Sequence, residues 1–264
     1  MSFPLANDAN AGTVVVVTGG GTGIGRATAR AFARTGASVA ICGRRSEPLE
    51  SARTELEAEG AACLAVPCDV REPDQVVSFL DQVIERFGAI DVLVNNAGGQ
   101  FTAPAEEISA KGWRAVHRLT VDAAWDVTRE AATRSMIPRR RGLVVFVGFS
   151  PRRGIPGFVH ASAARAALEN LAAGLSTEWS RHGIRTVCVV PGNIDTEALA
   201  AYGEDELEVA RRQVPLGRLG RPEEVADVIA FLATEGGAYI TGTSVVVDGG
   251  LDAWGQGEPP PTVG

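Results

Sequence analysis

The chain has 264 residues, of which 45% are hydrophobic and 22% charged, and its formal net charge is −7. This length predicts one domain, residues 1–264, and the acidic charge gives no general attraction to nucleic acid or anionic membranes. The four cysteines form no C-x-x-C pair, which favours buried thiols over disulfides or a metal site. With neither a signal peptide nor a run of roughly 20 apolar residues, the sequence predicts a cytoplasmic protein.

The first predicted element is a buried strand at 14–17, which leads through a glycine-rich turn into a helix over 23–34. Glycine permits positive φ and lets backbone N–H groups approach a pyrophosphate, while the helix N-terminus favours an anion. Strand, turn and helix in this order predict a dinucleotide site. The glycines of this motif are Gly19, Gly20, Gly21, Gly23 and Gly25.

A second strand, predicted at 37–42, ends in Gly43, Arg44 and Arg45, where an NAD-binding unit would carry an acid. Two guanidinium groups there can instead pair with a 2′-phosphate, so the sequence predicts NADPH (NADP+) as cofactor. Alternatively, the two arginines only begin a solvated helix at Ser46.

The pattern continues with a helix at about 47–59, a strand at 63–66, a helix at 74–87 and a strand at 90–94. Asp69, just past the third strand, can accept a hydrogen bond from an adenine amino group or cap the helix that begins near Pro73. Further strands are expected at 143–147, 186–190 and 243–247. Together they predict an α/β fold, a doubly wound Rossmann domain with a seven-stranded parallel sheet and helices on both faces.

Five motifs, in order and spacing, resemble the short-chain dehydrogenase/reductase family over about residues 11–254. They are Thr18-Gly19-x-x-x-Gly23-Ile24-Gly25, Asp69-Val70, Asn95-Asn96-Ala97-Gly98, Pro191-Gly192-Asn193-Ile194-Asp195-Thr196 and Val247-Asp248-Gly249-Gly250. The resemblance implies that Thr22 and Ile24 bind the pyrophosphate and that 96–98 lies against the adenine ribose. It also implies that Ile194 and Thr196 hold the nicotinamide carboxamide, although Thr196 could simply cap a helix.

Within that family, segments 95–101 and 104–113 resemble peroxisomal trans-2-enoyl-CoA reductases, and 159–167 resembles both these and 2,4-dienoyl-CoA reductases. Such enzymes use NADPH and act on acyl-CoA thioesters. The resemblance also shows where the family's catalytic asparagine, serine, tyrosine and lysine would fall. These positions are Thr120, Gly148 (or Ser150 if the loop shifts by two residues), Ala161 and Arg165.

The loss of tyrosine at Ala161 removes the usual acid/base for a carbonyl oxygen, and Arg165 can bind ribose hydroxyls but cannot relay protons. Reduction of an enoyl thioester tolerates this loss better, because its charge gathers on the thioester oxygen and needs only hydrogen-bond donors. His160 could donate there or protonate Cα, with Ser162 and Thr120 as weaker donors and Ser150 as a further candidate. Alternatively, His160 is structural and caps the helix of about 161–181.

The leading prediction is therefore an NADPH-dependent reductase of α,β-unsaturated acyl thioesters. The alternatives are a carbonyl or alcohol oxidoreductase in which His160 replaces the tyrosine, and a catalytically silent NADP(H)-binding protein. By resemblance, segment 197–214 is the substrate lid and the chain forms a homotetramer or a homodimer. The tail at 255–264 is expected to be flexible.

Overall fold

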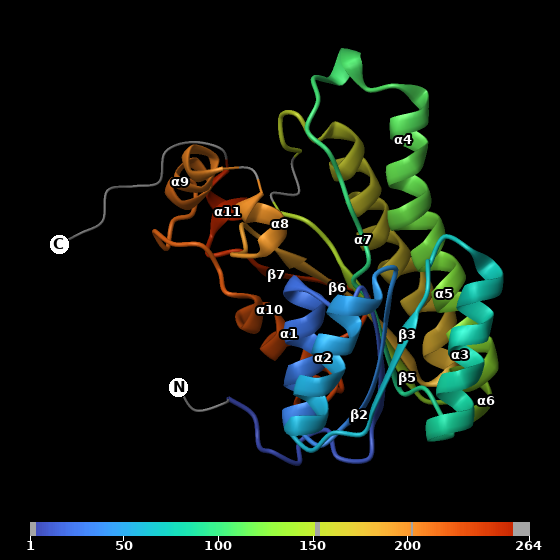
Figure 1. Cartoon of the computed structure of the whole chain (residues 1–264). Helices are drawn as coiled ribbons and strands as arrows, with labels where there is room; N and C mark the ends of the chain where they lie inside the picture. Colours follow the sequence, from blue (N-terminus) through green and yellow to red (C-terminus); the bar gives the residue numbers. More distant parts are fainter. Residues whose placement is uncertain (1–3, 151–153, 202, 256–264) are drawn as a thin grey trace.

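The structure is a computed structural model that describes residues 4–150, 154–201 and 203–255 (Figure 1). Seven parallel strands form one sheet in the order β3-β2-β1-β4-β5-β6-β7, which confirms the predicted fold class. The strands are β1 (Val14–Thr18), β2 (Ser38–Gly43), β3 (Cys63–Pro67), β4 (Val92–Asn95), β5 (Gly142–Val147), β6 (Ile184–Pro191) and β7 (Ser244–Val247). The strand order reverses between β1 and β4, which is where open parallel sheets bind ligands.

Helices cover both faces of the sheet, and each face has its own apolar core. On one face lie α1 (Gly23–Arg34), α2 (Ser46–Ala58) and α10 (Pro222–Leu232). On the other lie α3 (Pro73–Phe87), α5 (Ala123–Ala131) and α7 (Val159–Trp179), as Figure 1 shows. The inner strands are buried on both sides, which explains their unbroken runs of valine, leucine and isoleucine.

The long helix that follows β4 is not regular. It starts as α4 (Ala110–His117), passes through a π-helical turn, η2 (Arg118–Asp122), and continues as α5. A second π-helical turn, η3 (Ala132–Met136), precedes the short α6 (Ile137–Arg139). Each π turn accommodates an extra residue, so the side chains beyond it are rotated relative to a uniform helix. Thr120 lies at the centre of η2 and is buried.

Short helical segments complete the carboxyl-terminal third. The predicted lid consists of α8 (Glu197–Ala200) and α9 (Glu204–Arg212), and α11 (Leu251–Trp254) follows β7. Single 3-10 turns are η1 (Ala105–Glu107), η4 (Ser180–His182) and η5 (Glu235–Gly237). Apart from Gly255, the predicted flexible tail lies outside the described residues. Within the described part of the chain, no helix combines the length and apolar character that a membrane crossing requires.

Candidate dinucleotide and substrate site

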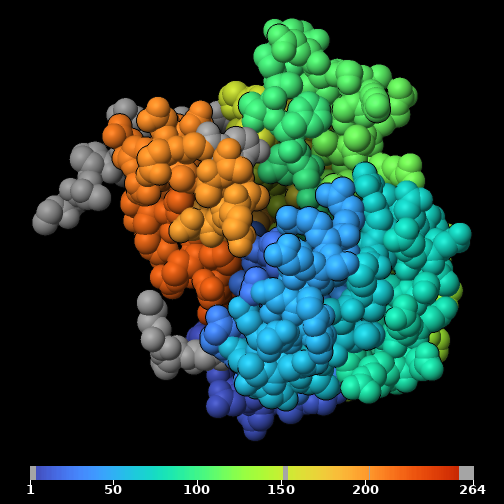
Figure 2. Space-filling model, in the orientation of Figure 1, coloured from blue at the N-terminus to red at the C-terminus, as the bar shows by residue number. Residues whose placement is uncertain are grey.

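A cavity of about 710 Å³ lies at the carboxyl ends of the central strands. In Figure 2 it opens between the blue surface of α1 and α2, the orange surface of α8 and α9, and the green surface of α4. The structure brings nearly all the predicted cofactor residues to its wall. These are Gly19, Gly21, Thr22, Gly23, Ile24, Arg44, Arg45, Asp69, Val70, Asn96, Ala97, Gly98, Arg165, Pro191, Gly192, Ile194 and Thr196.

The glycine-rich turn has the geometry that its sequence predicts. Gly19 and Gly23 adopt φ of 66° and 51°, in the region that side chains disfavour. Gly25 does not line the cavity, and its role is close packing. A Cβ there would lie 2.2 Å from the Gly19 carbonyl oxygen and 2.5 Å from Asn96 Nδ2. Thr22 precedes α1, so the positive end of that helix faces the cavity.

Asn96 fastens the glycine turn to β4, a role that the sequence did not indicate. Its Nδ2 donates to the carbonyl oxygens of Thr18 at 3.0 Å and Gly19 at 3.2 Å. The Thr18 hydroxyl in turn accepts from the backbone N–H groups of Asn96 and Ala97, each at 3.0 Å. The shape of the turn therefore depends on this asparagine, and its contact with an adenine ribose stays a prediction.

Arg44 and Arg45 lie exposed between β2 and α2, on the cavity rim. Arg45 is the N-cap residue of α2 and makes no side-chain capping bond. Among the described residues neither arginine forms an ion pair, whereas all four arginines on α1 and α2 do. Both guanidinium groups are thus available to an anionic group in the cavity.

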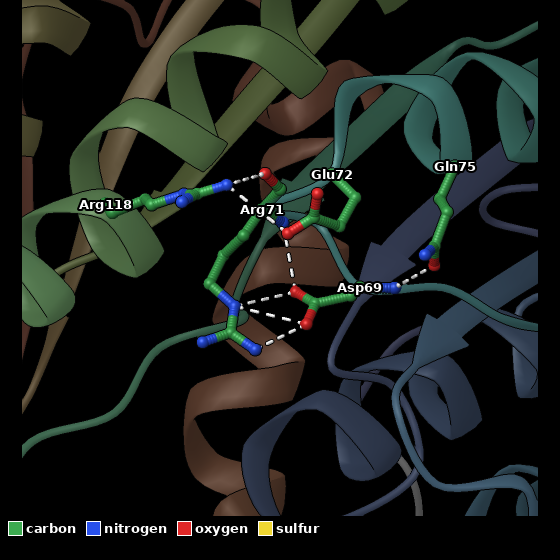
Figure 3. Close-up of polar contacts among 5 residues, drawn as sticks. All are labelled: Asp69, Arg71, Glu72, Gln75 and Arg118. Carbon is green, nitrogen blue, oxygen red and sulfur yellow. Dashed lines mark hydrogen bonds and ion pairs between the residues drawn. The ribbon is translucent and has the colours of Figure 1, made fainter.

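Asp69 lines the same cavity, and Figure 3 shows that its carboxylate is bound by Arg71. Its carboxylate accepts from Arg71 Nε at 2.9 Å, from Nη2 at 2.5 Å and from the Arg71 backbone N–H at 3.1 Å. These bonds lower the pKa of Asp69 to about 2. Arg118 from η2 donates to the Arg71 carbonyl at 3.1 Å and contacts Glu72 at 3.3 Å.

This arrangement corrects one of the two roles expected for Asp69. The residue does not cap the helix near Pro73, because the N-cap of α3 is Glu72 and the Asp69 carboxylate turns back on Arg71 instead. Its backbone N–H donates to Gln75 Oε1 at 2.9 Å, which ties the loop to the first turn of α3. The adenine contact stays a prediction. Arg71 is the main charged partner of Asp69, and Arg44 adds a weaker favourable charge interaction.

Arg165 projects from α7 into the cavity wall between β4 and β5. Its Nη1 donates to the Val147 carbonyl oxygen at 2.5 Å. A Cβ at Gly98 would lie 2.2 Å from Nη2, so only glycine leaves room for the guanidinium. Burial lowers the pKa of Arg165, but a guanidinium pKa starts so high that the group stays charged. The structure therefore places a fixed positive charge in the cavity wall.

Ser150 is buried and outside the cavity lining, so far as the described residues define it. Its hydroxyl donates to Asp248 Oδ2 at 2.6 Å, and its backbone N–H donates to the Pro191 carbonyl at 2.9 Å. Asp248 also accepts from the backbone N–H groups of Gly250 and Asp252. Ser150 thus joins the loop after β5 to the loop after β7, and a catalytic role for it stays a prediction.

Thr120 and His160 are also buried outside the described cavity lining. Within the described residues, the Thr120 hydroxyl and both ring nitrogens of His160 lack a hydrogen-bond partner, as does the Ser162 hydroxyl. The His160 ring stacks on Phe101, with centroids 4.2 Å apart. Buried polar groups are nearly always satisfied, so unpartnered ones indicate a bound water or ligand.

His160 does not cap its helix, which corrects that alternative. The helix begins at Val159 with Phe158 as its N-cap, and His160 lies inside the first turn with 0% of its surface exposed. Burial lowers the pKa of His160 and the nearby His117 adds to this shift, while the backbone of Phe101 opposes it more weakly. The imidazole is therefore neutral at pH 7 and carries a single N–H donor.

Replacing His160 with phenylalanine should reduce the acid sensitivity of folding. As the pH falls below the ordinary histidine pKa of 6.5, the unfolded chain binds a proton that the folded His160 resists. The contribution of His160 to the free energy of unfolding is therefore complete above that pH. Below that pH it decreases by up to about 1.4 kcal/mol per pH unit. Urea unfolding near pH 7.5 and near pH 5.5 measures this, with His182→Gln as control. Equal losses in wild type and His160→Phe would contradict the assignment.

Comparison with known proteins identifies the family. A family model described as enoyl-(acyl carrier protein) reductase matches residues 19–252. A Bacillus subtilis protein named "Probable 2,4-dienoyl-CoA reductase" is 34% identical over 89% of this chain and 95% of its own. The chain is a short-chain dehydrogenase/reductase. Members of this family are oxidoreductases that use NAD(P)H.

Other relatives of this short-chain dehydrogenase/reductase carry different substrate names. Gluconate 5-dehydrogenase of Gluconobacter oxydans is 35% identical over 91% of this chain and 94% of its own. Among solved structures, a citronellol catabolism dehydrogenase of Pseudomonas aeruginosa has a TM-score of 0.85 at 35% identity, covering 94% of this chain and 98% of its own. The fold and family are therefore secure, and the site itself must indicate the substrate.

The predicted lid of this dehydrogenase/reductase is anchored at both of its helices. The Thr196 hydroxyl accepts from the Leu199 backbone N–H at 3.3 Å, which confirms that Thr196 caps α8. Asn193 Nδ2 donates to the Ala210 carbonyl in α9 at 2.8 Å. Ala198 and Leu199 line the cavity, and Tyr202, which is also part of the predicted lid, lies outside the described residues. The lid is therefore tied directly to the loop that follows β6.

Proposed function

We propose that this protein is an NADPH-dependent reductase of α,β-unsaturated acyl thioesters, of the enoyl-CoA type. The observation that carries the proposal is the cavity wall, which contains Arg165 and, within the described residues, no tyrosine or lysine. The chain has two tyrosines and one lysine. Tyr239 is fully exposed, Lys111 is exposed on α4, and Tyr202 is the remaining tyrosine. A reaction that needs no phenol at the carbonyl oxygen fits this wall best.

The residues present fit a phosphorylated nicotinamide dinucleotide. The glycine turn and the start of α1 would hold its pyrophosphate, and the guanidinium groups of Arg44 and Arg45 would pair with its 2′-phosphate. Ile194 and Thr196, which also line the cavity, would hold the carboxamide. When bound, this cofactor supplies a hydride to the substrate.

Arg165 would serve two purposes in this reaction. Its guanidinium can donate to ribose hydroxyls, and its charge favours the enolate that forms on the thioester oxygen when Cβ is reduced. Because the group keeps its proton, it stabilises charge without transferring a proton. The bond to the Val147 carbonyl fixes its orientation.

The proton for Cα, or the hydrogen bond to the enolate oxygen, would come from buried polar groups on α7 and on η2, which pack against each other. His160 and Thr120 carry donors that nothing else satisfies among the described residues. Phe101 covers the His160 ring and is itself 37% exposed, so displacement of Phe101 by substrate would open the imidazole to the cavity. In this scheme Ser150 positions the loop through Asp248 and is not a donor.

Several relatives carry acyl thioester names, including a peroxisomal 2,4-dienoyl-CoA reductase of Danio rerio at 32% identity. Gluconate 5-dehydrogenase at 35% identity supports the second candidate, a carbonyl or alcohol oxidoreductase.

We also propose a cytoplasmic homotetramer, with the homodimer as alternative. Trp113 on α4 and Trp125 on α5 are 38% and 39% exposed, which suits helices that pair with a second subunit.

The function is tested by following NADPH consumption with crotonyl-CoA and, separately, with acetoacetyl-CoA. The proposal expects consumption with the enoyl thioester and none with the ketoacyl thioester. Consumption with ketones or aldehydes alone would favour the carbonyl oxidoreductase. Tight NADPH binding without turnover on a broad panel of thioesters and carbonyl compounds would instead indicate a silent binding protein.

A further inference from the structure

Two cysteines from neighbouring strands meet beside the cavity. Cys42 is near the end of β2, and Cys68 directly follows β3. Cys42 is paired with Val66 across the two parallel strands, and the Cys68 backbone N–H donates to the Gly43 carbonyl at 2.9 Å. Both cysteines therefore belong to the same face of the sheet and to the same apolar core. Their thiols are free and hydrogen-bonded to each other.

The two thiols occupy different positions relative to the cavity. Cys68 forms part of its wall, whereas Cys42 is completely buried behind it. The glycine turn rests on Cys42, since its carbonyl oxygen accepts from the Gly20 backbone N–H at 3.2 Å and its sulfur accepts from that of Gly19. A displacement of the Cys42 sulfur would therefore alter the hydrogen bonds that support the glycine turn.

The environments of the thiols assign them different chemical roles. The hydrogen bond from Cys42 lowers the pKa of Cys68, while the bond to Cys68 and burial raise the pKa of Cys42. The thiolate is the nucleophilic form, so Cys68, which is also the thiol that a molecule in the cavity can reach, reacts first. Cys42 is then placed to resolve the product.

We propose that Cys42 and Cys68 form a hydroperoxide-responsive dithiol whose oxidation to a disulfide weakens dinucleotide binding. The Cys68 thiolate attacks the hydroperoxide, the O–O bond breaks, and an alcohol or water leaves with a proton while Cys68 becomes a sulfenic acid. The Cys42 sulfur then attacks that sulfur, the S–O bond breaks, and water leaves as the S–S bond forms. The dithiol loses two electrons and two protons, and the hydroperoxide gains them.

The effect on cofactor binding follows from geometry and linkage. Forming the S–S bond draws the Cys42 sulfur toward Cys68 and away from the Gly19 N–H, which disturbs the glycine turn. A dinucleotide in the cavity covers Cys68, so it should also slow the oxidation. By linkage, if the disulfide lowers the affinity for the dinucleotide by a given factor, then bound dinucleotide disfavours the disulfide at equilibrium by the same factor. This inference rests on the cavity binding a dinucleotide, and it does not depend on the acyl substrate.

The test treats the full-length protein with a few equivalents of hydrogen peroxide, maps its disulfides by mass spectrometry, and measures NADPH affinity before and after dithiothreitol. The expected result is a Cys42–Cys68 linked peptide, an affinity at least about tenfold lower, and recovery on reduction. Bound NADP+ should slow the linkage. Failure to form the linked peptide, or a linked protein that binds NADPH as before, would overturn the proposal.

Matched variants separate this pair from other thiols. Cys42→Ser and Cys68→Ser should lose the peroxide effect on NADPH affinity, whatever their starting affinity. Cys63→Ser should keep it, because Cys63 is a buried thiol in β3 whose pKa is raised to about 12 by burial. If Cys42→Ser does not fold, Cys42→Ala serves in its place. A peroxide effect that persists in either Cys42 variant would reject the disulfide mechanism, whereas no NADPH binding by reduced wild type would instead reject the proposed cofactor.

Discussion

Replacing Arg44 and Arg45 together with alanine should raise the dissociation constant for NADPH about 100-fold or more and leave that for NADH within about threefold. Each guanidinium lies on the cavity rim without an ion pair among the described residues. A hydrogen bond to a charged group contributes about 1.5–3 kcal/mol, so the loss of two accounts for the expected change. Fluorescence titration of both nucleotides measures it directly.

The control for this prediction is Arg86→Ala. Arg86 is exposed in the last turn of α3, whereas Asp69 and the cavity lie near the first turn. Its removal changes the net charge by one unit without touching the cavity, and should alter neither affinity appreciably. If the double variant raised the dissociation constants for NADPH and NADH equally, the arginines would not bind the 2′-phosphate. The cofactor preference would then be wrong even though the dinucleotide site remained.

Replacing Arg165 with alanine should lower the turnover number with an enoyl thioester about 100-fold to 1,000-fold, the usual cost of removing one group that stabilises an oxyanion. NADPH affinity should fall much less, because the pyrophosphate and 2′-phosphate contacts come from other residues. Single-turnover kinetics with NADPH in excess separates the two effects. Arg165→Lys keeps the charge, and its turnover number should be at least about tenfold higher than that of Arg165→Ala.

Because Arg165 is partly buried and bonded to Val147, its variants need a folding control. Thermal unfolding monitored by circular dichroism should show Arg165→Ala still folded at the assay temperature. Arg181→Ala, at an exposed position just beyond α7, should match wild type in both rate and stability. A turnover number for Arg165→Ala within about threefold of wild type would remove this residue from the chemistry.

The fold could be predicted from sequence because its signals are local. The valine run of β1 is typical of a strand buried on both faces, and Gly36 and Gly88, both with positive φ, end their helices where the chain must turn. Helix and strand ends moved by one or two residues, since tertiary hydrogen bonds extend or shorten an element. The carboxyl ends of parallel strands meet at one edge, so the cofactor residues were brought together as expected.

The features that could not be predicted from the sequence depend on contacts between residues that are far apart in the chain. Ser150 and Asp248 are 98 positions apart, and the pairing of Cys42 with Cys68 follows only from the register of β2 and β3. The π-helical turn around Thr120 could not be recognised from the hydrophobic period of 3.6 residues that predicts an α-helix. The pair Asp69 and Arg71 is the exception. An arginine two residues after an aspartate at a loop is a local signal that could have been read.

The most direct test of the account identifies the atom that receives the hydride. The protein is given crotonyl-CoA and acetoacetyl-CoA together with NADPH deuterated at the transferring position, and the products are analysed by mass spectrometry and NMR. The account predicts butyryl-CoA with one deuterium on Cβ and no 3-hydroxybutyryl-CoA. Deuterium found in 3-hydroxybutyryl-CoA, with crotonyl-CoA left unreacted, would contradict it.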